Sequence, residues 1–353
     1  MNNYKLSNET KTTSSGTVLH RVVATKTFTL ANGNTVDAGD LGGWIEKESN
    51  LSDNAWVSDD AQVYGNAKVS GDALVFGNAQ VYGNAKVYGN ALVSGHALVY
   101  GNAEVSGDAQ VSGKAKVSGN AKVSGDALVS GNAQVYGDAL VSVNAKVSGN
   151  AMVSDNAQVY GYAIISENVL VYDNAQVDGD ARIIGDAQVY GNALVTSDAM
   201  VSGKAKVYGD ALVTGGAMVS GKAKVSGNAL VHEDAKVSGN ARVSGKANVY
   251  EYTFVCGNTL VSGNARVYGH AQVDGNAQVD GNAQVSGNAL VHEDAKVSGN
   301  ARVSGKANVS GDTPIAGDTK IKNMSDYMAY KNNLSNVLSD GLNDLSLQDD
   351  MQL

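Results

Sequence analysis

The sequence predicts an all-β fold in which one short strand is repeated many times to build a solenoid. From Ala55 to Ile321 the chain repeats a six-residue pattern, Ala-x-Val-y-Gly-Asn, without an insertion or deletion, where x and y are varied residues. The Val position recurs every sixth residue from Val57 onward, at 45 sites, and four of these carry Ile instead. A fixed short period is the sequence signature of a solenoid, whose repeats bury their apolar faces against their neighbours.

Each hexad is predicted to form one strand and one corner. In Ala-x-Val-y the first and third side chains point to one side and the second and fourth to the other, so Ala and Val face inward. The next two residues are mostly Gly followed by Asn or Asp, which adopt left-handed backbone angles at low cost. If three hexads close one coil of 18 residues, the 45 hexads give about 15 coils of parallel strands, stacked ~4.8 Å apart.

Composition and charge exclude several classes of protein. The chain has 42 Gly but a single Pro among 353 residues, which excludes collagen. Disorder is disfavoured because 43% of the residues are hydrophobic and 17% are charged. The lone Cys256 excludes a disulfide framework and a cysteine zinc site, and the net charge of −9 disfavours a nucleic-acid partner. With neither a signal peptide nor an apolar run near twenty residues, we expect a cytoplasmic protein without a membrane partner.

The hexads resemble those of the hexapeptide-repeat family of left-handed parallel β-helices, in which an aliphatic residue at i is followed by a small residue at i+4. Val-Ser-Gly-Asn-Ala and Val-Tyr-Gly-Asn-Ala satisfy this pattern across about three quarters of the chain. The resemblance implies a triangular coil of three hexads and a left-handed, single-stranded solenoid. The period alone does not give the hand, because crossovers are right-handed as a general rule. A right-handed β-helix is therefore the alternative.

Residues 1–44 lack the hexad and are predicted to form a small β-rich cap. Strand-like stretches cover 17–23 and 27–30, and a turn follows at 31–34. Residues 45–322 form the predicted solenoid, which needs caps because an exposed end coil leaves strand edges unpaired.

The segment that leads into the array, Gly39-Asp40-Leu41-Gly42-Gly43-Trp44, adds a second resemblance. Followed by Val-Tyr-Gly-Asn-Ala repeats, it is similar to a group of uncharacterised bacterial and prophage hexapeptide proteins, some of which carry a provisional acetyltransferase label. This resemblance implies a phage-encoded role, such as a virion part or an inhibitor of a host protein.

Residues 323–353 are predicted to form a helical cap or tail. Ser325 is a candidate N-cap, and Gly341 is expected to divide the helix in two. The segment is expected to bury an apolar stripe on the last coil, and a short oligomerisation helix is the alternative. The stripe consists of residues that recur at helical spacing: Tyr327, Met328, Leu334, Val337, Leu338, Leu342 and Leu345.

Enzymes of the hexapeptide-repeat family are mostly acyl and nucleotidyl transferases. The resemblance implies a His general base and loops that leave the coil to hold substrate and acyl carrier. The 45 hexads contain no such loop, and smooth walls offer little concave volume for a small molecule. We therefore predict no catalytic residue, metal ligand or cofactor. The sequence disfavours an enzyme, and an acyltransferase is the alternative.

The histidines fit structural positions. His20 lies in the cap, and His96 and His270 take the corner position of Asn, where His tolerates left-handed angles. His232 and His292 each belong to a His-Glu-Asp sequence, but consecutive corner residues cannot converge on one ion without a further ligand.

The two His-Glu-Asp sequences are copies. Residues 225–249 recur at 285–309 without a difference, at an offset of 60 residues. Ten hexads are not a whole number of three-hexad coils, so the second copy is predicted to lie on a different face. A catalytic His that was copied to a different face would acquire different neighbouring residues and lose its role. The exact copy therefore indicates that hexads behave as interchangeable units.

Every third hexad belongs to the same outer face, and the three faces are named here by their first outward residue: the Trp56 wall, the Gln62 wall and the Lys68 wall. On the Trp56 wall nine of the fifteen x residues are apolar, against four of fifteen on each other wall, and its y column is mostly Ser. We hypothesise that this wall is the interface of a homodimer or homotrimer; scattered surface apolar side chains are the alternative. The predicted interface residues are Trp56, Leu74, Leu92, Leu128, Ile164, Met200, Met218, Phe254 and Leu290.

The y column of the Gln62 wall is rich in Tyr, whereas that of the Trp56 wall has none. These side chains are predicted either to support one another as a stacked ladder or to form a recognition surface for a protein partner. The ladder consists of Tyr64, Tyr82, Tyr100, Tyr136, Tyr172, Tyr190 and Tyr208.

The sequence thus predicts a non-catalytic, rod-like scaffold or protein-binding module that self-associates along one face. An ice-binding prism is disfavoured because the columns lack a regular Thr-x-Thr array, and a DNA mimic because acidic residues form no continuous stripe.

Overall fold

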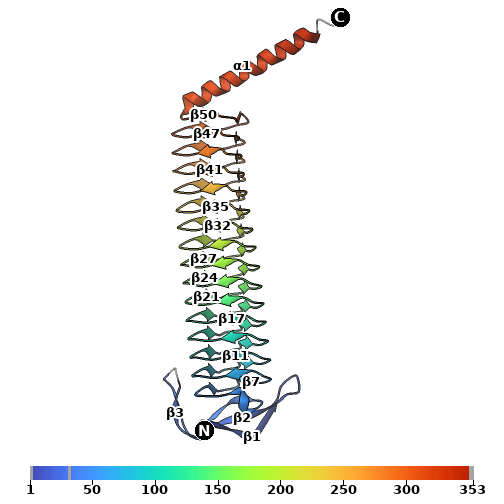
Figure 1. The fold of residues 1–353 in the computed structure, drawn as a ribbon, viewed down its shortest axis with the longest axis vertical. Helices are drawn as coiled ribbons and strands as arrows, with labels where there is room; N and C mark the ends of the chain where they lie inside the picture. The colour runs from blue at the N-terminus through green and yellow to red at the C-terminus, as the bar shows by residue number, and fades with distance from the viewer. Residues whose placement is uncertain (1–2, 31–32, 350–353) are drawn as a thin grey trace. The chain divides into compact units, whose positions relative to one another are not determined.

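A computed structural model describes residues 3–30 and 33–349 of the chain. The chain divides into two compact units, Met1–Lys204 and Ala205–Leu353. Each unit contains β-solenoid with the six-residue period (Figure 1). Together the described residues hold forty-five hexad strands, which make about fifteen turns of β-solenoid. The predicted fold class is confirmed, and the left hand that the resemblance implies stays a prediction.

The first unit begins with a cap of antiparallel strands. β1 (Tyr4–Thr12) pairs with β2 (Val18–Ala24), and β2 pairs with β5 (Leu41–Ile45). A separate hairpin joins β3 (Phe28–Thr29) to β4 (Thr35–Val36). The predicted strands over 17–23 and 27–30 correspond to β2 and β3, whereas β1 was not predicted. The first two residues of the predicted turn at 31–34 lie outside the described residues.

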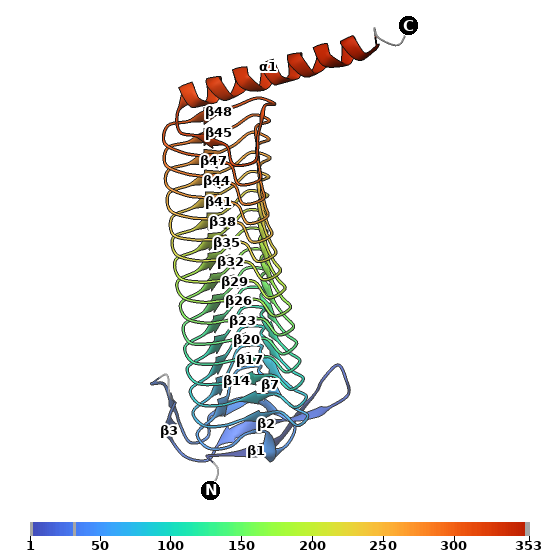
Figure 2. The ribbon, with the colours of Figure 1, turned by 45° about the horizontal axis from the view of Figure 1, so that its top comes forward.

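The cap continues directly into the solenoid. The second half of β5 pairs in parallel with β7 (Gln62–Val63), so that Ile45 lies beside Val63. Between the two lies the short 3-10 helix η1 (Glu48–Asn50). The Tyr4 hydroxyl lies 2.6 Å from the backbone carbonyl oxygen of Glu48 and 2.6 Å from that of Leu51. Burial, helped by the Glu48 carboxylate, raises the pKa of Tyr4 to about 12. The cap therefore closes the first coils with paired backbone (Figure 2).

Two-residue strands form the solenoid of the first unit. They run from β6 (Trp56–Val57) to β30 (Met200–Val201), and each begins six residues after the one before. Within the unit, strands pair in parallel with the strand three hexads later, as Gln62 does with Gln80. The N–H of Gln62 donates to the Ala79 carbonyl of the next coil at 2.9 Å. This register brings residues 18 apart into one wall and gives the unit three walls.

The second unit repeats this arrangement from β31 (Lys206–Val207) to β50 (Lys320–Ile321), again with one strand every six residues. Lys206 and Lys224 are register partners, as are Val207 and Val225. In both units the inward Val and Ile side chains are buried, and the inward Ala side chains beside them are too. The alternation read from the sequence therefore gives the core of each unit.

The corners depend on left-handed backbone angles. Gly149 has φ 70°, and a Cβ there would lie 2.6 Å from the backbone nitrogen of Glu167 on the next coil. Asp and Glu take this corner position in several hexads. In one hexad it is Val143, with φ 63°. A β-branched side chain is strained at such an angle.

The second corner residue builds hydrogen-bonded ladders of its own. The Asn66 side-chain amide donates to Asn84 Oδ1 at 3.1 Å, and the chain of bonds continues through Asn102 and Asn120 to Asp138. An amide can both accept from one neighbour and donate to the next, whereas an ionised carboxylate only accepts. Asp138 therefore ends this ladder.

The second unit ends in the helix α1 (Met324–Asp349). Its N-cap is Asn323, whose Oδ1 accepts the N–H of Asp326 at 3.0 Å, so the prediction of Ser325 was wrong. The helix also continues through Gly341, where the sequence had predicted a break. A glycine inside a helix costs only about 1 kcal/mol.

The start of α1 packs on the last coils. Tyr327 is buried and its hydroxyl donates to the Ser310 carbonyl, while the Tyr330 hydroxyl donates to the Pro314 carbonyl at 2.9 Å. Figure 2 shows the rest of α1 extending past the edge of the coil. The predicted burial of an apolar stripe is therefore wrong for Met328 and Val337, which are 48% and 67% exposed. A helix of 26 residues is about 39 Å long, more than one coil can cover.

Three residues of the predicted stripe cannot be compared in this way. The side chains of Leu338, Leu342 and Leu345 lie outside those that the structure describes.

Ile165 and Ile164 give a matched test of the core, because adjacent residues of β24 (Ile164–Ile165) point inward and outward. We expect Ile165→Ala to lower the free energy of unfolding by about 2–5 kcal/mol, because it leaves a cavity in the closed coil. Ile164→Ala should cost less than about 1 kcal/mol. Urea unfolding followed by circular dichroism measures both, and equal losses would contradict the inward assignment.

Val143→Gly tests the corner geometry. We expect this substitution to raise the free energy of unfolding by about 1 kcal/mol, because Gly adopts φ near 63° without a Cβ clash. The measurement is the same urea titration, and a loss of stability would show that the Val143 side chain contributes more than its backbone strain costs.

Candidate interaction surfaces

The first two predicted interface residues of the Trp56 wall are buried in the structure. Trp56 is 3% exposed and Leu74, its register partner, is 6% exposed. The Trp56 ring packs edge-on against Phe28 of the cap, with the ring centres 5.5 Å apart. Both residues were predicted to contact a partner, and the structure contradicts this because they are covered within their own chain. The hexad pattern cannot show that a hairpin outside the array folds back on it.

The remaining interface residues of the first unit lie on the wall with polar and basic residues between them. Leu92, Leu128, Ile164 and Met200 are half-buried, so each keeps part of its surface in solvent. In register order the column alternates these side chains with others, and the predicted ridge is not continuous: Leu92, Gln110, Leu128, Lys146, Ile164, Arg182, Met200.

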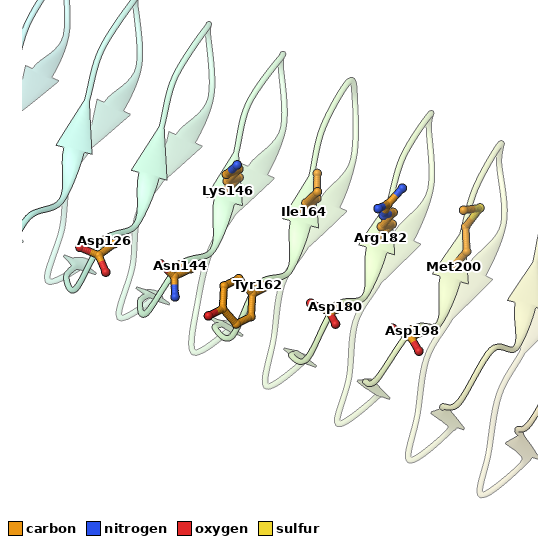
Figure 3. A pocket seen from close by; sticks show the side chains of 9 residues that line it. All are labelled: Asp126, Asn144, Lys146, Tyr162, Ile164, Asp180, Arg182, Asp198 and Met200. Atoms are coloured by element: carbon orange, nitrogen blue, oxygen red, sulfur yellow. The ribbon is translucent and has the colours of Figure 1, made fainter.

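A groove of about 670 Å³ follows this column. One side is the x column, and the other is the column of second corner residues, each of which ends the preceding hexad and lies two positions before its x residue. Figure 3 shows the two rows on successive coils, with their side chains directed away from the ribbon. The x side carries the cations and the corner side carries the carboxylates. The lining residues are Lys146, Ile164, Arg182 and Met200, and Asp126, Asn144, Tyr162, Asp180 and Asp198.

The second unit has a similar groove on its own Trp56 wall. It measures about 420 Å³ and is lined by Gly216, Met218, Asp234, Lys236, Tyr252 and Phe254. Phe254 is 42% exposed, and the Lys236 ammonium lies 5.0 Å from its ring centre. Met218 and Leu290 are half-buried.

The sequence patterns of the x and y columns predicted an interface, and no role was predicted for the column of second corner residues. On one coil of the first unit the two columns carry Asp180 and Arg182, and on another they carry Tyr162 and Ile164. In the second unit they carry Asp234 with Lys236 and Tyr252 with Phe254. Opposite charges, or two large side chains with apolar surface, therefore occur two residues apart, at the end of one hexad and the x position of the next. This signal was already present in the sequence.

The Tyr ladder of the Gln62 wall is stacked where Tyr residues are register neighbours. Tyr64, Tyr82 and Tyr100 form two stacks with ring centres 5.0 and 5.1 Å apart and nearly parallel planes. Tyr172 and Tyr190 stack at 4.9 Å. Burial, and next the neighbouring Tyr, raises the pKa of Tyr64, Tyr82 and Tyr172 above its ordinary value.

Tyr136 stands apart from those stacks. Its neighbours on the wall are Ser118 and Ser154, and its hydroxyl contacts Met152 Sδ at 3.0 Å. A shorter stack on the Lys68 wall of the second unit joins His232, Tyr250 and Tyr268, at 5.0 and 5.1 Å. His232 was not among the residues predicted to form a ladder.

The two copied His-Glu-Asp sequences make equivalent contacts on different walls. His232 Nε2 lies 3.0 Å from Asn248 Oδ1, and His292 Nε2 lies 2.7 Å from Asn308 Oδ1. β35 (Leu230–Val231) belongs to the Lys68 wall and β45 (Leu290–Val291) to the Trp56 wall, which confirms the predicted change of face. In the part of the chain that the structure describes, no three His, Cys, Asp or Glu side chains are placed to hold a metal ion.

Cys256 is half-buried on the y column of the Trp56 wall. Burial, and next the Asp274 carboxylate, raises the pKa of its thiol above the ordinary value. The side chain is therefore mainly a neutral thiol near pH 7, which makes it a poor nucleophile.

Seven segments of the array match the family model described as YdcK Beta solenoid repeat. The repeats are β-solenoid repeats similar to those of YdcK. The matched segments cover less than half of the chain and lie in both units: 61–77, 67–83, 79–95, 121–137, 145–161, 187–203 and 295–311.

Two solved structures match this chain at low identity. A Bacillus cereus protein, provisionally described as an acetyltransferase, is 14% identical over 47% of this chain and 78% of its own, with a TM-score of 0.20. A protein from Desulfovibrio desulfuricans G20 with the same provisional description is 8% identical over 75% of this chain and 66% of its own, also with a TM-score of 0.20. TM-scores this low carry no argument about activity. No curated protein matches the chain.

Within residues 3–30 and 33–349, no helix combines the length and the apolar composition that crossing a bilayer requires.

Tyr82 and Tyr136 give a matched pair for the Tyr ladder. We expect Tyr82→Ser to lower the free energy of unfolding by about 1–3 kcal/mol more than Tyr136→Ser, because it removes two stacked ring pairs. Ser already occupies this position in other hexads, so the backbone should not change. Chemical denaturation measures both variants. Equal losses would show that stacking does not stabilise the wall and would favour a recognition role.

Proposed function

We propose that the chain is a non-catalytic scaffold that assembles with a second copy of itself along the Trp56 wall. The observation that carries this proposal is the pairing of each second corner residue with the x residue two positions later on the same coil, with opposite charges at Asp180 and Arg182 and again at Asp234 and Lys236. Electrostatic complementarity between two columns favours a specific register of contact.

A parallel twofold arrangement uses this pairing. A twofold axis along the stacking direction sets the corner column of one copy against the x column of the other on the same coil. Asp180 then faces Arg182 of the second copy, and Tyr162 faces Ile164 of the second copy. Each contact occurs twice, as a twofold interface requires.

The solvent-exposed parts of the x side chains supply the apolar component of this contact. Leu128, Ile164 and Met200 are half-buried on an open wall, and Phe254 in the second unit is 42% exposed. Large aromatic and Met side chains are enriched in the centres of interfaces. The scaffold would then present its other walls, including the Tyr ladder, to a protein partner. A phage-encoded role as a virion part or an inhibitor of a host protein stays a prediction.

A charge exchange at one coil tests the self-association. In sedimentation velocity we expect a dimer, weakened at least about tenfold by Asp180→Lys, because two charge pairs become repulsive. Asp180→Lys combined with Arg182→Glu should restore the dimer. Both changes use residues that other hexads already carry at these positions, Lys114 at the corner and Glu104 at x.

The control is Lys116→Glu, an exposed charge reversal on the Gln62 wall, which should leave the dimer unchanged. A wild-type monomer at micromolar concentration would overturn the proposal, and so would a double variant no better than the single one. Saturable binding of acetyl-CoA, seen as a concentration-dependent rise in melting temperature, would instead support an acyltransferase.

A further inference from the structure

A second cavity lies at the end of the Lys68 wall of the second unit, away from the Trp56 wall. It measures about 310 Å³ and belongs to the last rungs of β44 (Gln284–Val285), β47 (Arg302–Val303) and β50. Three cationic side chains line it together with hydroxyl groups: Arg302, Lys320 and Lys322, with Ser286, Ser304 and Tyr268.

The register fixes how the three cations are arranged. Arg302 and Lys320 are direct register partners on adjacent strands, about 4.8 Å apart along the wall. Lys322 follows Lys320 by two residues, so it lies on the same outer face about 6.6 Å along the strand direction. The three residues therefore mark a triangle and not a line. Ser304, at the y position that follows Arg302, lies beside Lys322 on the adjacent coil and completes the fourth corner of the arrangement.

Like charges placed directly opposite each other on adjacent strands destabilise a sheet. Elsewhere on the Lys68 wall, in the first unit, such a column is balanced by an acid built into it. The Glu104 carboxylate lies 3.0 Å from the Lys86 ammonium and 4.0 Å from that of Lys122. The end of the wall in the second unit has no acid in that column.

Two carboxylates close to these cations in the chain, Asp318 and Asp326, accept hydrogen bonds from other groups. Asp318 accepts a hydrogen bond from the Asn300 amide at 3.1 Å, on the other side of the x column. Asp326 accepts the backbone N–H of Lys322 at 2.8 Å. Within the described residues, none of Arg302, Lys320 and Lys322 is in an ion pair with an N–O distance of 4.0 Å or less.

We propose that this cavity is a binding site for a phosphate group, either free or as a terminal monoester of a small molecule. A phosphate carries close to two negative charges and presents three or more acceptor oxygens near neutral pH. The Arg302 guanidinium can donate to two of these oxygens at once, and the two Lys ammonium groups supply further donors. A carboxylate has only two oxygens and one charge, so it meets fewer of the donors that the triangle offers.

The Gln62 wall of the same unit supplies a matched control. Lys206, Lys224 and Arg242 are also three successive cations, but they lie in one column. The last cation of this column, Arg242, is followed at the y position by Ser244. In the proposed site the last cation of the column, Lys320, is followed at the y position by Lys322. If anions are attracted only by basic surface charge, both groups of cations should bind phosphate. A specific site would bind phosphate only at the triangle of Arg302, Lys320 and Lys322.

Isothermal titration calorimetry with inorganic phosphate tests the proposal on the full chain. We expect saturable binding, also with phenyl phosphate, and no saturable heat with sodium chloride at equal ionic strength. Arg302→Gln and Lys322→Ser should each weaken binding at least about tenfold, because each removes a charged donor. Gln and Ser occupy these positions in other hexads, and two separate variants guard against a local folding defect.

Lys224→Gln is the control and should bind phosphate as the wild type does. Three results would overturn the proposal: no saturable binding by the wild type, equal weakening by Lys224→Gln, or an acetate affinity equal to that of phosphate. None of these depends on the oligomeric state, so the site and the proposed self-association fail separately.

Discussion

Closure of each coil after 18 residues is the constraint on which the rest of the structure depends. Ladder bonds join the N–H of Gln62 to Ala79 and that of Tyr64 to Val81, so every coil is held by the next one in fixed register. Since side chains alternate between the two faces of a strand, one inserted residue would turn the following Val outward and an x residue inward. The array therefore accepts many substitutions at outward positions and no change of length from Ala55 to Ile321.

The same constraint turns outward positions into columns. Equivalent residues on successive coils lie about 4.8 Å apart, close enough for amides to bond and rings to stack. Asn66 and its successors form a hydrogen-bonded ladder that ends at an Asp, and Tyr82 stacks on both of its neighbours. A column of like charges is the unfavourable counterpart, relieved by Glu104 in one place and left unrelieved at Arg302 and Lys320 in another.

Both proposed surfaces arise from two neighbouring columns read together. On the Trp56 wall the corner and x columns carry complementary groups on the same coil, as Asp180 and Arg182 do. At the end of the Lys68 wall, x and y residues bring a third cation, Lys322, beside Arg302 and Lys320. The copied segment shows the limits of such surfaces, because moving it by ten hexads placed His292 on a different wall from His232 while keeping its contact to Asn.

The sequence by itself determined the inward Val and the corner Gly, because both follow from a local period of six. It indicated the three walls, and the change of face of the copied segment, only through its resemblance to left-handed parallel β-helices, and the 18-residue register of the structure decided them. It could not determine where the ends of the chain fold. Trp56 and Leu74 read as open surface and are buried, Trp56 against Phe28 of the cap, whereas Met328 and Val337 read as a buried stripe and are exposed. These contacts join segments with no shared period, so only the packing of cap and helix on the end coils decided them.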